Sequence, residues 1–473
     1  MEIREKLSRK ITIIIGLLIA GIVGFRAVYL SFTIDESITY SILQGDLTYL
    51  MTANHHILNT FLMKISGGLF GESELALRLP NVILCLVYVL FVYRFLRLEK
   101  SGWAALLGVT ILLLNPFLID FFSLARGYGL SVGFMMGSLY YLLRKNLAEQ
   151  NFAFYMNDVI LTIVFAILAL FSNLSTINFF IAVLLILIVQ YILLHRRLSF
   201  NIKNHLQFSA VVILALIALY LAMDRLLMLN EAKQLYFGVD SLSDMLATLY
   251  VNVLYHFNNF TILSIFIGIV FVLAALVIAV TKKFDSQLFK LYIILVLLIS
   301  ATVTQHYFFD AKYPAERTAI YFVPVFGVFV YRLFSELYQL SNNKPSRWLV
   351  RSGLVTIILM TVINFSQWSR TSFTNTSVWK FDMHTKEVAI KIGALGYEEC
   401  RTESFTLSNH WLFQPTLNYY IHSLDLPIEP ALHDPDTNTH FVYNYIDKFD
   451  GDGYEVVLTF DDIGTSLFRK IID

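Results

Sequence analysis

Two adjacent carboxylates follow the first long apolar run of the chain. They are Asp35 and Glu36, in the stretch FTIDESITYSILQGDLTYLMTANHHILNTFLMK that runs from Phe32 to Lys64. Their apolar neighbours predict that they lie at the edge of a membrane, where acids are costly and usually functional. A partly desolvated carboxylate can act as a general base or hold a hard cation. The alternative is a solvated loop that happens to contain two acids.

The same stretch contains a pair of imidazoles, in Asn54-His55-His56, and ends at a cation, Lys64. Adjacent histidines point to different faces of a helix, so at most one of them is expected to face a shared site. We favour His56, because it directly precedes the apolar run ILNTFLMK. The alternative is a histidine that only makes hydrogen bonds near the membrane interface.

Two arginines stand in later apolar segments. Arg126 follows Asp120 in NPFLIDFFSLARGYGLS, and Arg317 lies in YPAERTAIYFVP. Guanidinium groups match the geometry of phosphate oxygens, so both arginines are candidates for binding a phosphate-bearing substrate. The alternatives are an ion pair between Asp120 and Arg126 within their hairpin, and an interface-anchoring role for Arg317.

Composition indicates that membrane-spanning helices position these residues. Hydrophobic residues make up 57% of the 473, charged residues only 15%, and the mean hydropathy is +0.64, whereas soluble domains are about 25% charged. The net charge of +0 gives no indication of a nucleic-acid partner. Since a span needs roughly 20 apolar residues, we predict about eleven spans, near 11–32, 80–97, 103–122, 127–144, 157–173, 176–194, 206–226, 259–280, 287–304, 317–334 and 350–367.

The loops alternate in charge, which predicts the orientation. With the N-terminus inside, basic residues collect in the inside loops, for example Arg94, Arg144 and Lys203, while most acids fall outside. We interpret the first apolar run, near 11–32, as a membrane anchor that is not cleaved off. Three outside segments are long: about 33–79, where ILNTFLMKISGGLFG is expected to form an interfacial helix, then 227–258, and everything after about 367.

The final segment turns soluble in composition and predicts a small α/β domain over 367–473, after a membrane module over 1–366. YEVVLTF indicates a strand, and HTKEVAIKIGALGY indicates a short helix that ends at a glycine. The two cysteines, Cys85 and Cys400, lie in an apolar and a polar setting. Their settings argue against a disulfide framework or a zinc knuckle.

The order of these motifs resembles the GT-C glycosyltransferases. The relevant segments are DE, then NHHILNTFLMKISGGLFGESELALRLPNVI, then LARGYGL. They are most similar to the group, of family 39 type, that includes protein O-mannosyltransferases and the aminoarabinose transferase of lipid A. Roughly the first 145 residues carry the resemblance, and ERTAIYFVP matches more loosely. HILN stands where members of this group usually have His-Pro-Pro.

The resemblance implies an all-α polytopic membrane protein with interfacial helices and a C-terminal domain outside. It implies an inverting enzyme that moves a hexosyl or pentosyl group from a polyprenyl-phosphate carrier to a glycan, lipid or protein acceptor on the extracytoplasmic face. A bacterial inner membrane with a cytoplasmic N-terminus is the expected location. A divalent metal ion is an open expectation, because family members vary in metal use.

The implied roles fall on the residues already introduced. Asp35 is expected to be the general base, and Glu36, Asp120 and His56 to support it or hold a metal ion with it. Arg126 and Arg317, with Lys64 as a weaker candidate, are expected to stabilise the leaving phosphate. Asn54, His55 and Tyr128 are supporting candidates. Glu74 and Arg78 are expected to pair near the start of the second span.

Two other classes of protein remain open at this stage. A secondary transporter would place charges at mid-membrane and often shows inverted repeats, whereas the charges here collect at one surface. A flippase or polymerase of lipid-linked saccharides would also bind polyprenyl phosphates, so it is harder to separate from a transferase.

Overall fold

The computed structural model describes residues 2–97, 101–144, 151–198, 200–254, 260–341, 344–398, 405–429, 432 and 439–471. Cys400 lies outside these ranges. The chain forms two compact units. We call Met1–Gly24, His56–Asn59 and Pro80–Arg370 the helical unit, and Phe25–His55, Thr60–Leu79 and Thr371–Asp473 the mixed unit.

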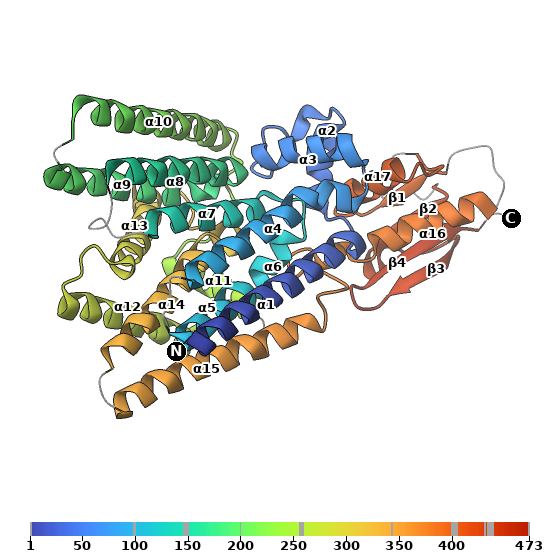
Figure 1. Cartoon of the computed structure of the whole chain (residues 1–473). Coiled ribbons are helices and arrows are strands. Elements are labelled where there is room, and N and C mark those ends of the chain that lie inside the picture. The colour runs from blue at the N-terminus through green and yellow to red at the C-terminus, as the bar shows by residue number, and fades with distance from the viewer. Residues whose placement is uncertain are drawn as a thin grey trace. The chain divides into compact units, whose positions relative to one another are not determined.

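The helical unit is built from long helices (Figure 1). Three helices contribute to both units: α1 (Glu2–Tyr29), α3 (Ile57–Phe70) and α4 (Glu74–Leu96). The others are α5 (Gly102–Leu113), α6 (Pro116–Phe122), α7 (Gly127–Leu143), α8 (Phe152–Ser172), α9 (Ile177–Leu198), α10 (Ile202–Glu231), α11 (Leu242–Val253), α12 (Phe260–Thr281), α13 (Gln287–Phe309), α14 (Phe322–Leu340) and α15 (Lys344–Ser369), with the 3-10 turns η3 (Leu174–Thr176) and η4 (Glu316–Ala319).

Local sequence explains where several of these helices begin. Ser101, Asn151, Asn201 and Ser286 are N-caps whose side chains accept a hydrogen bond from the backbone N–H three residues later. Such caps satisfy donors that the first helical turn leaves unpaired. The helices that follow these caps consist mostly of apolar residues, so packing and lipid contact, rather than polar partners, stabilise them.

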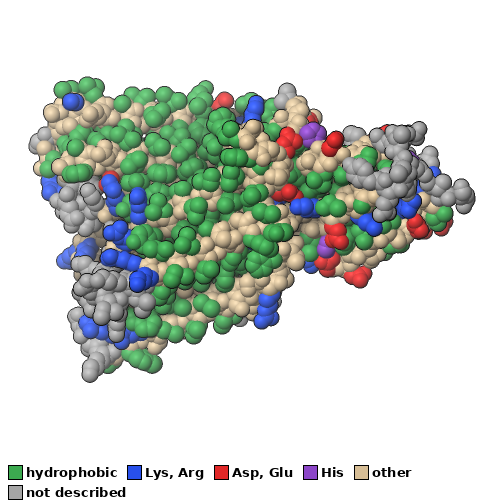
Figure 2. Space-filling view, turned by 45° about the vertical axis from the view of Figure 1, so that its right-hand side comes forward, with side chains coloured by type: hydrophobic (Ala, Val, Ile, Leu, Met, Phe, Trp, Pro, Cys, Tyr) green, Lys and Arg blue, Asp and Glu red, His purple; other side chains and the backbone are tan. Residues whose placement is uncertain are grey.

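Within the described ranges, eight helices are long and apolar enough to cross a membrane, or nine if the bent pair α5–α6 is one span. Figure 2 shows the matching surface, broadly hydrophobic over the helical unit, with Lys and Arg side chains gathered at one end of that unit. The protein is therefore an integral membrane protein. All eleven predicted spans coincide with helices, but two fall outside the eight or nine. Helix α7 has 17 residues, and α14 carries Arg332 and Glu336.

The mixed unit contains a four-stranded sheet in the order β1-β2-β4-β3. Strands β1 (Leu407–Asn409) and β2 (Phe441–Tyr445) are parallel, and β4 (Thr465–Lys470) pairs antiparallel with β2 and with β3 (Tyr454–Phe460). Val442, Tyr454 and Phe468 form a buried cluster on it. The unit also contains α2 (Ile34–Leu43), α16 (Thr385–Glu398), α17 (Gln414–Ser423), and the 3-10 turns η1 (Leu47–Tyr49), η5 (Lys380–Asp382) and η6 (Ile446–Lys448).

The expected C-terminal α/β domain is thus present, with YEVVLTF forming β3. The predicted end of the helix in HTKEVAIKIGALGY is wrong, since α16 continues past Gly396 to Glu398. Helix α17 packs against both α16 and α2. The segment that carries Asp35 and the C-terminal residues therefore belong to one folded unit.

Candidate functional site

The first turn of α2 holds both carboxylates of the opening motif. Thr33 is the N-cap of this helix, and it forms a reciprocal capping box with Glu36. Asp35 is 5% exposed and Glu36 is fully buried. Burial of two acids in one turn requires specific partners for their charges.

Glu36 is paired with Arg78, whose side chain is also fully buried. Arg78 Nε donates to Glu36 Oε1 at 2.8 Å and Nη2 donates to Oε2 at 2.7 Å. The remaining donors reach the backbone carbonyls of Ala27, Leu30 and Ser31. The carboxylate of Glu36 is thereby held in the fold of the mixed unit.

The expected pairing of Arg78 with Glu74 is wrong. Glu74 Oε1 instead lies 2.6 Å from Lys386 Nζ and accepts a hydrogen bond from Tyr420 at 3.2 Å. Glu74 and Arg78 lie one helical turn apart in the sequence, but in the folded chain each pairs with a residue of another element.

A further carboxylate, which the sequence analysis missed, lies next to Asp35. Asp382, the last residue of η5, is 1% exposed and accepts a hydrogen bond from the backbone N–H of Ile34 at 2.7 Å. Its carboxyl also interacts electrostatically with Asp35. Burial, and then the charge of Asp35, raise the pKa of Asp382 well above its ordinary value. The only hint in the sequence is an acid between the apolar residues of WKFDM.

In the helical unit, Asp120 lies in the short helix α6. It is 3% exposed, and its carboxylate accepts a hydrogen bond from the indole N–H of Trp368 at 3.0 Å. Helix α6 begins at Pro116 with Asn115 as its N-cap, and it is bent by 51° from α5. The bend turns the chain away from the direction of α5 just before Asp120.

Arg126 is the N-cap of α7 and lies beside the ring of Tyr128. Its side chain is fully buried and its guanidinium carbon lies 5.8 Å from the centre of the Tyr128 ring. The ring of His56 packs edge-on against Tyr128 at 4.9 Å. The structure therefore brings three predicted residues together: Arg126, Tyr128 and the histidine that was favoured over His55.

Close packing fixes this cluster. A Cβ at Gly127 would lie 1.8 Å from the carbonyl oxygen of Ser172 and 2.8 Å from the ring of His56, so only glycine fits there. Asn59 donates to the carbonyl of Ala125 at 2.8 Å and accepts from Asn81 at 3.1 Å. The backbone before Arg126 is thus tied to the start of α3.

Arg317 lies in the turn η4. Its guanidinium carbon is 4.6 Å from the centre of the Phe237 ring, and Nη1 is 3.8 Å from Glu316. Glu316 has a φ of 46°, a left-handed conformation that non-glycine residues rarely adopt and that concentrates at functional sites. Paired backbone hydrogen bonds between Val239 and Tyr313 hold the loop of Phe237 against this turn.

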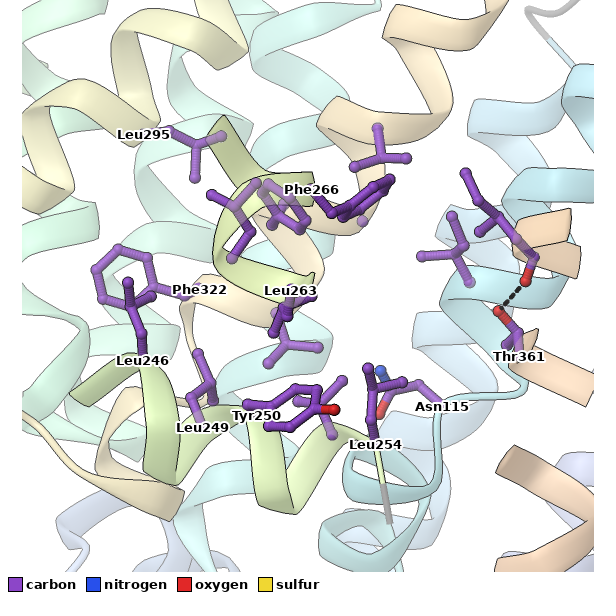
Figure 3. A pocket seen from close by; sticks show the side chains of 18 of the residues that line it. Asn115, Leu246, Leu249, Tyr250, Leu254, Leu263, Phe266, Leu295, Phe322 and Thr361 are labelled. Carbon is purple, nitrogen blue, oxygen red and sulfur yellow. Dashed lines mark hydrogen bonds between the residues drawn. The ribbon is translucent and has the colours of Figure 1, made fainter. Parts of the chain in front are cut away.

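An apolar cavity of about 270 Å³ opens between helices α5, α11, α12, α13, α14 and α15 (Figure 3). Leu246, Leu249 and Tyr250 of α11 face it, together with Phe322 of α14. Helix α11 also packs against η4, where Glu316 N–H donates to Thr248 at 3.4 Å. One face of α11 therefore lines the cavity while its neighbour η4 carries Arg317.

The remaining candidates are less enclosed. Lys64 is exposed, and Asn54 and His55 are half-buried, with His55 bonded to the carbonyl of Leu50 at 3.1 Å. Asp35 belongs to the mixed unit, whereas Arg126 and Arg317 belong to the helical unit. Their predicted convergence on one pocket stays a prediction.

Within the described ranges, no three His, Cys, Asp or Glu side chains form a group that could hold a metal ion. Glu36, one of the candidates, directs both carboxylate oxygens to Arg78. The divalent ion stays a prediction.

Comparison with known proteins gives one matching sequence family and several similar solved structures. Residues 54–223 match the family described as dolichyl-phosphate-mannose-protein mannosyltransferase. The crystal structure of ArnT from Cupriavidus metallidurans in the apo state has a TM-score of 0.56 and 12% identity, covering 97% of this chain and 98% of that one. The same protein bound to undecaprenyl phosphate has a TM-score of 0.55 and 13% identity, with the same coverage. No curated protein matches the sequence.

At these identities the similarity to ArnT concerns the fold. The chain has the fold of the GT-C glycosyltransferases, over nearly its whole length. The resemblance inferred from the DE, SELALRLP and ARGY motifs is confirmed at this level, since the matched family segment includes two of these motifs.

Proposed function

We propose that the chain is an inverting glycosyltransferase that moves a sugar from a polyprenyl-phosphate carrier to an acceptor on the extracytoplasmic face of the membrane. The observation that carries this proposal is the apolar cavity whose wall, α11, packs against the turn of Arg317. A polyprenyl phosphate needs both features, an apolar channel for its chain and a cation for its phosphate.

The lining of the cavity suits a branched hydrocarbon. It consists largely of Leu, Ile, Val and Phe side chains, with Asn115, Thr361 and Asn364 as polar members. Isoprene units can pack against such a surface by van der Waals contact and require no hydrogen bonds there. ArnT, which has a similar fold, has a crystal structure with undecaprenyl phosphate bound. That structure supports the same class of donor for this chain.

The proposed reaction is a single in-line displacement. The oxygen of an acceptor hydroxyl attacks the anomeric carbon while the bond from that carbon to the phosphate oxygen breaks. Asp35 accepts the hydroxyl proton, and polyprenyl phosphate leaves with the bonding electron pair. Arg126 and Arg317 stabilise the charge that develops on the phosphate. Attack opposite the leaving group inverts the anomeric centre.

The charge distribution supports the orientation, because basic loops favour the cytoplasm and the extracytoplasmic side is then expected for α2, η4 and the C-terminal residues. The bacterial inner membrane is part of the proposal on the ground of the family resemblance alone. There the acceptor can be a glycan, lipid or protein that enters from water. The donor sugar can be a hexose or a pentose.

The experiment is an assay of acceptor-dependent release of polyprenyl phosphate. Purified protein receives radiolabelled undecaprenyl-phosphate mannose or aminoarabinose in detergent, with cell-envelope extract as acceptor. We expect Asp35→Asn to abolish release while undecaprenyl phosphate still binds, and Arg317→Ala to weaken that binding. Asp224→Asn and Arg94→Ala, which change the same groups elsewhere, serve as matched controls.

A second variant tests the cavity. Leu249→Trp fills it and should raise the KM for undecaprenyl donors more than for short-chain donors, whereas Leu216→Trp on the exposed face of α10 should not. Movement of intact donor across vesicles without release of polyprenyl phosphate would instead identify a transporter or flippase and overturn the proposal.

A further inference from the structure

Two buried side chains from the C-terminal residues hold the backbone of the segment that carries Asp35. Asp382 accepts a hydrogen bond from the N–H of Ile34 at 2.7 Å. The hydroxyl oxygen of Tyr420 accepts one from the N–H of Phe32, also at 2.7 Å. Both acceptors are 1% exposed. Residues more than 340 positions away in sequence thus fix alternate backbone groups just before Asp35.

Neither of these backbone donors has a partner within a helix, because Phe32 lies between α1 and α2 and Ile34 is at the start of α2. Ile34 is the first residue of α2, and the first N–H groups of a helix have no intrahelical acceptor. A carboxylate there also interacts favourably with the helix dipole. Arg78 binds the carbonyls of Leu30 and Ser31 from the other direction, so the chain from Leu30 to Ile34 is held through both its donors and its acceptors.

Asp382 is itself held in place. Thr385 donates to its Oδ1 at 3.4 Å, and Thr416 bonds to the same carboxyl. Thr416 in turn accepts a hydrogen bond from Ser37, within α2, at 3.4 Å. Side chains of η5, α16 and α17 therefore form a continuous support around the first turn of α2.

We propose that Asp382 is a positioning residue for Asp35, so that the C-terminal domain completes the catalytic centre. The inference rests on the proposed function, in which Asp35 is the general base. Asp382 acts by fixing the first turn of α2, and it reaches Asp35 through the adjacent peptide group of Ile34. Displacement of a catalytic group by about 1 Å can reduce a rate on the order of 100-fold.

The test compares three variants of the full chain. Asp382→Ala removes the acceptor and should lower kcat roughly 10- to 100-fold, with the KM for the undecaprenyl donor unchanged. Asp382→Asn keeps an oxygen that can accept from Ile34 N–H, so it should restore most of the lost kcat. Tyr420→Phe removes the other acceptor and should lower kcat less. Asp462→Ala removes a carboxylate of the same domain that binds His384 instead, and it should leave kcat unchanged.

Hydrogen exchange supplies a readout that does not depend on activity. Asp382→Ala should increase amide exchange in the peptide 32–43, and Asp382→Asn should not. An unchanged kcat in Asp382→Ala, or an Asp382→Asn variant no better than Asp382→Ala, would overturn the inference. Absence of acceptor-dependent release in the unaltered protein would instead count against the proposed function, while the exchange data would still report the contact.

Discussion

At the scale of single residues, Arg78 shows how a buried charge is accommodated. Its five hydrogen bonds go to Glu36 and to three backbone carbonyls. A lysine cannot replace this fork, because an ammonium group has three donors and no planar geometry. Arg78 therefore joins the end of α1, the first turn of α2 and the start of α4.

We predict that Arg78→Ala destabilises the protein by about 3–5 kcal/mol, because it leaves the carboxylate of Glu36 buried without its counter-charge. Denaturant unfolding in detergent, followed by tryptophan fluorescence, measures the change. Arg94→Ala, at the other end of α4, should cost less than about 1 kcal/mol. Equal effects of the two variants would show that the Glu36 pair contributes no special stability.

Asp382 also predicts a dependence of stability on pH. Its folded-state pKa lies well above the ordinary value of 3.8, so between these values the folded protein binds a proton that the unfolded chain has released. The free energy of unfolding therefore falls as pH rises through that window and levels off above it.

Asp382→Asn cannot titrate at this position and should lack that fall. The Tm of the variant minus that of the unaltered protein, measured from pH 4 upward, should increase with pH until the folded pKa is passed. A constant difference across the pH range would contradict the prediction.

The type of a residue and its apolar neighbours predicted whether the residue is buried better than they predicted which residues it contacts. Asp35, Glu36, Asp120 and Arg126 stand in apolar sequence, and all four are buried. The partners of such residues come from distant parts of the chain, as Trp368 does for Asp120 and Asp382 for Ile34. A single sequence contains no signal that links positions so far apart.

At the scale of elements, apolar length predicted the membrane helices because a span must exceed a fixed thickness. Shorter elements were harder. Helix α11 was taken as part of a loop, since its 12 residues lie in a segment with many polar positions. The end of α16 was misplaced because glycine only weakens a helix and tertiary contacts can carry the helix past it.

The junction of α7 and α8 gives a prediction at this scale. Gly127→Ala places a methyl group where the carbonyl of Ser172 and the ring of His56 already lie, and overpacking of this kind costs about 1–3 kcal/mol or more. The Tm in detergent should fall. Gly268→Ala on α12 is the matched control, because its added Cβ would meet nothing within 4 Å. A loss no larger than that of the control would refute the packing argument.

At the scale of the whole molecule, the prediction concerns orientation. In a variant with Cys85 and Cys400 replaced by serine, we expect Asp462→Cys to react with a membrane-impermeant maleimide in intact spheroplasts. Lys203→Cys, in the first turn of α10 at the end of an expected inside loop, should react only after permeabilisation. Both side chains are exposed, so access to the reagent decides the result. The reverse pattern would invert the topology.

The two compact units could not be read from composition, because their boundaries fall inside α1, α3 and α4. Composition detected the change from apolar to soluble sequence near residue 367, four residues before the last segment of the mixed unit begins. It could not show that Phe25–His55 folds with residues from that segment. The contacts of Ile34, Phe32 and Arg26 with distant residues show this.

The hydrogen bond between Ile34 and Asp382 joins residues 348 positions apart. At ordinary synthesis rates the ribosome needs roughly 20 to 70 s to cover that distance. During this interval the nascent opening loop lacks the acceptor that orders its first helical turn. A newly made molecule therefore acquires the arranged first turn of α2 only after residue 382 has been synthesised, so under the proposed mechanism shorter nascent chains lack a positioned general base.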